Sequence, residues 1–174
     1  EGKRVIFDAE HFYDGYKTSS SFALKMLEAA EKGGADTLVL CDTNGGSLPE
    51  FIQEATRAVV QKFESRIGVH VHNDGGLATA NTLAAVMAGA THVQGTINGV
   101  GERCGNANLG TIIPNLILKM NQQMQSKIDL KKLTPLTHFV YELMNLHPDD
   151  QAPYVGKSAF AHKGGIHVSA VMKD

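Results

Sequence analysis

The segment Ile67-Gly-Val-His-Val-His-Asn-Asp-Gly-Gly76 contains the pattern that organises the chain: a short apolar run that ends in a polar, glycine-rich cluster. Such a run is typical of a buried strand. Similar runs begin at residues 4 and 37, and a shorter one covers 92–95. Apolar residues at helical spacing follow each strand. The predicted helices cover 20–32, 48–63 with Ser47 as its N-cap, 77–88 and 111–124.

This alternation of strand and helix predicts an α/β fold with a parallel sheet covered by helices. Four βα units correspond to half of a (β/α)₈ TIM-type barrel, which takes about 250 residues in full. We therefore expect residues 1–125 to be the C-terminal half of a barrel and the chain to be a piece of something longer. Helices are predicted within 128–145, and residues 126–174 to contain a terminal helix and the start of a loop-rich linker subdomain.

The composition argues against several classes of protein. The formal net charge of −2 gives no electrostatic reason to expect binding to nucleic acid or to an anionic membrane. The sequence contains no apolar run of the roughly 20 residues that a membrane-spanning helix needs. Two cysteines are too few for a disulfide framework, so a cytoplasmic protein is expected.

The pair His70 and His72 is the strongest local sign of chemistry. Side chains alternate along a strand, so both imidazoles are predicted to project from one face, about 7 Å apart. Two such rings can bind one divalent cation with help from another strand. The alternative is that both rings are hydrogen-bonded to backbone or water, and the pair by itself does not decide between these interpretations.

Three longer blocks carry a resemblance to a known family. The first is His70-Val-His-Asn-Asp-Gly-Gly-Leu-Ala-Thr-Ala-Asn-Thr-Leu-Ala-Ala85, and the second is Gly95-Thr-Ile-Asn-Gly-Val-Gly-Glu-Arg-Cys-Gly-Asn-Ala-Asn-Leu109. The third is Val155-Gly-Lys-Ser-Ala-Phe-Ala-His-Lys-Gly-Gly-Ile-His167. Together they resemble the isopropylmalate, homocitrate and citramalate synthases. The segments 7–16 and 41–46 are similar to the citramalate branch of that family.

The resemblance implies a metal site. His70, His72 and Asn106 would be ligands of Mg²⁺, Mn²⁺ or Zn²⁺. The family's further aspartate ligand lies on the first barrel strand, and no matching motif precedes Val5. The resemblance also implies a homodimer that acts only on small molecules.

The implied reaction is an acyl transfer in which acetyl-CoA condenses with a 2-keto acid, here pyruvate, to give citramalate and CoA. Glu10 would be a catalytic base or orient one, and His167 would act as a base or acid or activate water. Thr43 would bind the keto acid carboxylate. Asn73 and Asp74 would support the metal shell or bind substrate, or else pair structurally.

Other functions stay open at this point. A different keto acid would give isopropylmalate or homocitrate, and a related carbon–carbon lyase is a third possibility. Such lyases carry a catalytic cysteine in the corresponding loop, but we interpret Cys104 here as a packing or loop residue. The chain could also be a non-catalytic piece that closes a barrel with another chain, since half a barrel leaves unpaired strand edges.

Overall fold

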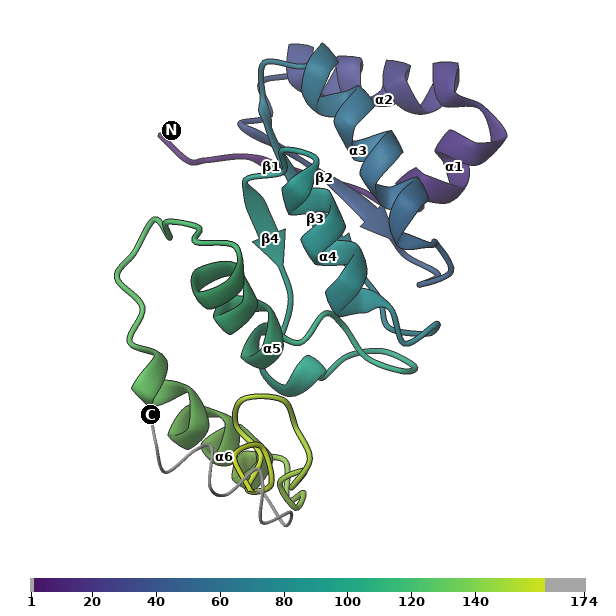
Figure 1. Ribbon diagram of the computed structural model, residues 1–174. Coiled ribbons are helices and arrows are strands. Elements are labelled where there is room, and N and C mark those ends of the chain that lie inside the picture. Colours follow the sequence, from purple (N-terminus) through teal and green to yellow (C-terminus); the bar gives the residue numbers. More distant parts are fainter. Residues whose placement is uncertain (1, 162–174) are drawn as a thin grey trace. The chain divides into compact units, whose positions relative to one another are not determined.

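The computed structural model describes residues 2–161, and the chain divides into two compact units, Glu1–Ile112 and Ile113–Asp174 (Figure 1). The first unit is built around a four-stranded parallel sheet in the order β1-β2-β3-β4. Its strands are β1 (Ile6–Ala9), β2 (Thr37–Asp42), β3 (Arg66–Val71) and β4 (His92–Gln94). The predicted α/β fold with consecutive parallel strands is therefore confirmed.

Helices connect these strands and lie together on one side of the sheet in Figure 1. They are α1 (Phe12–Thr18), α2 (Ser20–Lys32), α3 (Pro49–Lys62) and α4 (Ala78–Met87), with a short 3₁₀ turn η1 (Ile97–Gly99) after β4. The face of the sheet toward the helices is apolar, and Leu38, Leu40 and Val69 on it are fully buried. Burial of such side chains supplies the main driving force for this layer.

Two local predictions about the helices were wrong. The N-cap of α3 is Leu48 and not Ser47. The Ser47 hydroxyl instead donates to Asp42 Oδ1 at the end of β2, over 3.1 Å, and the Ser47 backbone N–H donates to Asp42 Oδ2 over 3.2 Å. Helix α1 was not predicted at all. Its residues Phe12 and Tyr13 are buried, which a local polar pattern around residues 9–11 does not reveal.

The sheet curves strongly. Gln94 Nε2 on β4 donates to Asp8 Oδ1 on β1 over 3.0 Å, although β2 and β3 lie between these strands. In a flat sheet three strand spacings would separate β1 and β4 by roughly 14 Å. The contact requires a sheet that closes toward the face carrying both side chains, as the wall of a barrel does. Within the described residues, β1 and β4 are the two edges of the sheet.

The described part of the second unit combines short helices with turns and irregular segments. Helix α5 (Leu109–Pro114), which crosses the division between the units, runs into a π-helical turn η2 (Asn115–Lys119). The helix predicted over 111–124 thus starts earlier and ends sooner. A 3₁₀ turn η3 (Leu130–Lys132) and α6 (Leu133–Leu143) confirm the helices predicted within 128–145. The predicted domain boundary after residue 125 stays a prediction. A small core joins Leu133, Ala152 and Val155, with Tyr154 packed against it.

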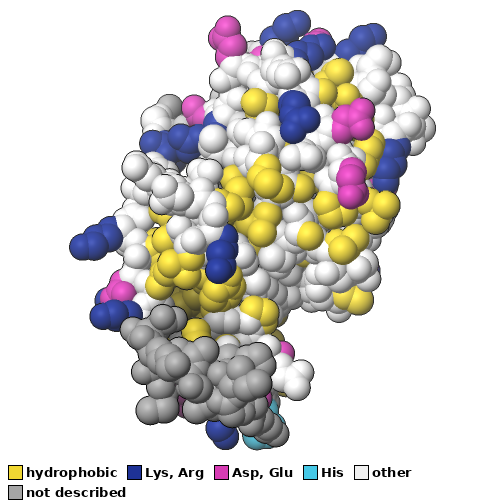
Figure 2. Space-filling view, viewed as in Figure 1, with side chains coloured by type: hydrophobic (Ala, Val, Ile, Leu, Met, Phe, Trp, Pro, Cys, Tyr) yellow, Lys and Arg dark blue, Asp and Glu magenta, His cyan; other side chains and the backbone are white. Residues whose placement is uncertain are grey.

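Surface features agree with the sequence. On the face drawn in Figure 2, basic and acidic side chains are mixed and do not form one large patch of a single sign. In the described part of the chain, every helix is too short or too polar to cross a membrane.

Candidate metal and substrate site

The polar clusters at the carboxyl ends of β1, β2 and β3 meet at one edge of the first unit. His70 lies near the end of β3, and His72 follows the strand. Their ring centroids are 5.2 Å apart with planes inclined at 44°, so the two imidazoles lie side by side. This is the arrangement predicted from strand alternation.

His72 and Asn106 bring two unsatisfied polar atoms to this place. Their backbones form an isolated antiparallel bridge, which brings the loop after β4 against the end of β3. His72 Nδ1 and Asn106 Oδ1 are buried, and neither has a hydrogen-bond partner among the described residues. The Asn106 amide nitrogen faces Val100 O at 3.5 Å. An unpartnered buried polar atom costs free energy. A cation bound between these two atoms would satisfy both of them.

The state of His72 also suits a ligand. Burial lowers the pKa of His72, and the neighbouring His70 and Arg103 lower it further. The ring is therefore neutral at physiological pH and has a lone pair to offer. Among the described residues, no group of three His, Cys, Asp or Glu side chains could hold a metal by itself. The two imidazoles and Asn106 Oδ1 together could offer a divalent cation a mixed set of nitrogen and oxygen ligands.

His70 is hydrogen-bonded to Gln94, and Gln94 is in turn hydrogen-bonded to Asp8. Sequence reasoning identified neither Gln94 nor Asp8. His70 Nδ1 lies 2.7 Å from Gln94 Oε1, and Gln94 Nε2 donates to Asp8. Gln94 is directly opposite His70 in the β3–β4 register. Pairing the third and fourth predicted strands side by side would therefore have placed Gln94 next to His70. Asp8 lies on β1, two strands from His70 and three from Gln94, and its position in the sequence gave no such signal.

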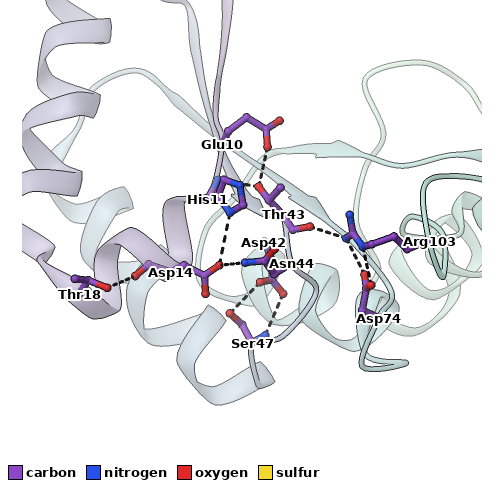
Figure 3. Close-up of polar contacts among 10 residues, drawn as sticks. All are labelled: Glu10, His11, Asp14, Thr18, Asp42, Thr43, Asn44, Ser47, Asp74 and Arg103. Atoms are coloured by element: carbon purple, nitrogen blue, oxygen red, sulfur yellow. Dashed lines mark hydrogen bonds and ion pairs between the residues drawn. The ribbon is translucent and has the colours of Figure 1, made fainter.

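Glu10 and Thr43 form a second polar group (Figure 3). Thr43 Oγ1 donates to Glu10 Oε2 over 2.7 Å and accepts the backbone N–H of His11 over 2.7 Å. Because the backbone N–H can only donate, the single hydroxyl proton of Thr43 is directed at Glu10. Nearby, Asn44 Nδ2 donates to Asp14 Oδ2 over 2.7 Å and ties the loop after β2 to α1.

Arg103 joins three loops. Its guanidinium makes a bidentate pair with Asp74 at 2.7 and 2.9 Å and donates to Thr43 O over 2.7 Å. The Arg103 hydrogen bonds hold the pKa of Asp74 below its usual range. Arg103 itself has φ of 56°, in the left-handed region that costs an L-residue conformational energy.

Backbone contacts strengthen the same junction. The Gly75 N–H donates to Gly45 O over 3.1 Å, and the Asn73 N–H donates to Gly105 O over 2.9 Å. A Cβ on Gly45 would lie 2.8 Å from the backbone nitrogen of Asp74, and Gly45 has φ of +61°. The loops after β2, β3 and β4 are therefore in backbone contact, and glycine is required at position 45.

The remaining predicted residues are placed as follows. Asn73 Oδ1 accepts the Ala78 N–H over 3.1 Å at the start of α4, so this side chain and that of Asp74 both have structural partners. Their predicted role in substrate binding stays a prediction. Cys104 is exposed. His167 lies outside the described residues.

His92 lies in the strand predicted over 92–95. It begins β4, it is half-buried, and its Nε2 has no hydrogen-bond partner among the described residues. Burial lowers the pKa of this ring. Gly68 makes room for it, since a Cβ there would lie 2.9 Å from His92 Cδ2.

Comparison with known proteins gives consistent results. The model of the HMGL-like family matches residues 2–140. The (R)-citramalate synthase of Aquifex aeolicus is 58% identical over 171 residues, which cover 98% of this chain and 32% of that protein. The (R)-citramalate synthase of Synechocystis is 53% identical, covering 100% and 33%. The 2-isopropylmalate synthase of Campylobacter concisus is 39% identical, covering 92% and 32%. The chain thus spans about a third of the length of the curated relatives it matches.

Solved structures share the fold. The HMG-CoA lyase of Bacillus subtilis superposes with a TM-score of 0.67 at 23% identity, over 82% of this chain and 50% of that one. The carboxyl transferase domain of Rhizobium etli pyruvate carboxylase superposes with a TM-score of 0.64 at 20% identity, over 82% and 24%. This likeness agrees with the predicted barrel-type fold, of which the chain contains a part.

Proposed function

Because this chain belongs to the HMGL-like family, we propose that it forms the metal-binding part of an (R)-citramalate synthase, which condenses acetyl-CoA with pyruvate. The relatives confirm the resemblance to citramalate synthases found in the sequence. The observation that carries the proposal is the pair of buried, unpartnered atoms His72 Nδ1 and Asn106 Oδ1 beside the His70 ring. Most buried polar atoms in proteins have a hydrogen-bond partner, so two unpartnered atoms side by side next to His70 support a bound cation there.

His70, His72 and Asn106 would hold one divalent cation, Mg²⁺, Mn²⁺ or Zn²⁺. A cation held there supplies a Lewis acid for the ketone oxygen of the keto acid. The three side chains come from β3, from its end and from the loop after β4, so strand pairing and the His72–Asn106 bridge fix their spacing.

Glu10 is the proposed base for the methyl group of acetyl-CoA. Its carboxylate would take a methyl proton, and the resulting carbon would bond to the ketone carbon of pyruvate, whose oxygen ends as a hydroxyl group. Water then cleaves the thioester to release citramalate and CoA. General-base catalysis of this kind is typically worth about 10²–10⁴ in rate. His167, at the other end of the chain, is the proposed partner in the later proton transfers.

Thr43 couples substrate binding to this base. Its one hydroxyl proton is donated to Glu10 in the structure. If the hydroxyl turns to donate to the pyruvate carboxylate, Glu10 Oε2 loses that bond and becomes free to accept a methyl proton. On this view substrate binding itself releases the base. Asn73 and Asp74 would support the same pocket from the loop after β3.

For the intact protein we also propose a cytoplasmic homodimer that acts on small molecules alone. The mixed surface charge and the net charge of −2 support the absence of a nucleic-acid partner. The mass of the intact protein measured by analytical ultracentrifugation tests the dimer, and a monomeric mass would contradict it.

The reaction is tested by thiol release from acetyl-CoA in the intact protein. We expect the highest kcat/KM with pyruvate and loss of activity after dialysis against a chelator. The alternative substrates are the keto acids that lead to isopropylmalate and homocitrate. The 39% identity to a 2-isopropylmalate synthase makes the first of these the necessary comparison. A higher kcat/KM with it would assign the protein to that branch.

A further inference from the structure

Gln94 and Asp8 form a hydrogen-bonded chain with His70 that crosses the concave face of the sheet. The His70 Nδ1 to Gln94 Oε1 distance is 2.7 Å, and the Gln94 Nε2 to Asp8 Oδ1 distance is 3.0 Å. None of the three residues is adjacent to another in sequence, and the last contact spans 86 positions. Such a long-range chain needs an explanation beyond local packing.

The direction of each bond follows from chemistry. A carboxylate oxygen can only accept, so the amide group of Gln94 must turn its NH₂ toward Asp8. Its carbonyl oxygen then faces His70 and can also only accept. The proton of a neutral His70 ring must therefore sit on Nδ1, and the lone pair is left on Nε2.

We propose that Gln94 and Asp8 are positioning residues for the cation site: Asp8 orients the Gln94 amide, and Gln94 fixes the tautomer and ring angle of His70. The inference rests on the proposed function, since it gives His70 a cation to bind. A ligating histidine commonly donates its other ring N–H to an oxygen acceptor, and loss of that acceptor costs about 10- to 100-fold in metal affinity. Neither Gln94 nor Asp8 needs to touch the cation for this effect.

The geometry explains why a glutamine and an aspartate are needed together. Gln94 alone could flip its amide and present NH₂ to His70, which would require the ring proton on Nε2 and would block the ligand atom. Asp8 removes that choice. The curvature of the sheet is what brings this carboxylate within reach of β4.

The test measures Mn²⁺ affinity in the intact protein by calorimetry and electron paramagnetic resonance. Gln94→Leu removes the acceptor and should raise the Kd about 10- to 100-fold. Gln61→Leu, at an exposed position of α3, is the matched control and should leave the Kd unchanged. An unchanged Kd in Gln94→Leu would overturn the inference, as would a wild-type protein that binds no Mn²⁺.

A swapped pair separates positioning from simple packing. Gln94→Glu alone places two carboxylates together and should weaken Mn²⁺ binding. The double variant Asp8→Asn/Gln94→Glu restores one amide and one carboxylate, with an oxygen acceptor still facing His70. We expect its Kd to return toward the wild-type value. A folded double variant that binds as weakly as Gln94→Glu would contradict the orientation argument.

The tautomer can be observed directly in the metal-free protein. Selective ¹⁵N-histidine labelling and two-bond ¹H–¹⁵N spectra should show His70 protonated at Nδ1. An Nε2-protonated His70 in the wild type would overturn the inference. Gln94-dependent Mn²⁺ binding without turnover of pyruvate would support the inference and contradict only the proposed reaction.

Discussion

Arg103 Nε and Asp74 Oδ1 are 2.7 Å apart, and the second bond of the same pair, from Nη2 to Oδ2, measures 2.9 Å. This bidentate pair joins the loop after β4 to the loop after β3, and its side chains are only partly exposed. Its contribution to stability should depend on pH. Arg103→Gln should lower the free energy of unfolding at pH 7, because Asp74 loses its partner.

The difference from the wild type should shrink in acid. The folded-state pKa of Asp74 is lowered, mainly by its hydrogen bonds to Arg103. The pair therefore stabilises the fold above the unfolded pKa of about 3.9, and this contribution is lost as the pH falls through the folded pKa. Urea unfolding at pH 7 and below pH 3.9 measures it. Arg57→Gln, at an exposed position of α3, is the control, and a pH-independent difference for Arg103→Gln would contradict the prediction.

Glu10→Gln should reduce kcat by about 10²–10⁴ with acetyl-CoA and pyruvate, because an amide cannot take the methyl proton. The measurement is steady-state thiol release. The control is Glu50→Gln in the exposed first turn of α3, which should retain wild-type kcat. Wild-type kcat in Glu10→Gln would exclude Glu10 as the base.

Thr43→Val should lower kcat/KM for pyruvate, whereas Thr43→Ser should keep most of it, because serine retains the hydroxyl that Thr43 directs at Glu10. Valine also leaves the His11 N–H without its acceptor, so the melting temperature of each variant is measured alongside. Equal kinetics in the Val and Ser variants would argue that the hydroxyl has no part in the reaction.

His72→Ala should abolish stoichiometric metal in the intact protein, since it removes one of the proposed ligands. Elemental analysis after dialysis measures the metal directly. His147→Ala changes an exposed histidine of the second unit and serves as the control. Metal content that is the same in both variants would refute the site.

Tyr13→Phe should destabilise the protein by about 1–3 kcal/mol. The Tyr13 hydroxyl lies 2.8 Å from Thr56 Oγ1, both side chains are fully buried, and burial raises the pKa of Tyr13, so the neutral phenol is the relevant form. Adding Thr56→Val should recover part of the loss, because no polar group is then left alone. Tyr16→Phe, on the same helix, is the control and should leave the free energy of unfolding measured in urea nearly unchanged.

Much of the fold could be predicted because strand and helix signals are local. Helix α2 has the bounds predicted from its apolar spacing, and β3 ends within one residue of its predicted end. Helix α1 was missed because its stability is not local. Phe12 and Tyr13 pack against each other, and Tyr13 and Tyr16 each face Phe51 of α3 with ring centroids 6.3 Å apart.

The candidate site likewise has a part that local sequence predicts and a part that depends on the whole sheet. His70 and His72 are two positions apart on one strand, so alternation alone predicted that they face the same way. Asn106 came only from the family resemblance. The link from Gln94 to Asp8 depends on how far the sheet curves, and curvature is a property of all four strands together. No single segment of the sequence encodes it.

The contacts among the loops after β2, β3 and β4 have a practical consequence for redesign. Arg103 forms hydrogen bonds to the loops after β2 and β3. Position 45 must be glycine because a Cβ there would lie too close to the backbone nitrogen of Asp74, and the Asn73 N–H donates to Gly105 O. If only one of these loops were replaced by the loop of a homologue that prefers another keto acid, the new loop would lose contacts with the two native loops that remain. Transplanting all three as a set keeps the mutual fit, and this is the smallest exchange we would attempt.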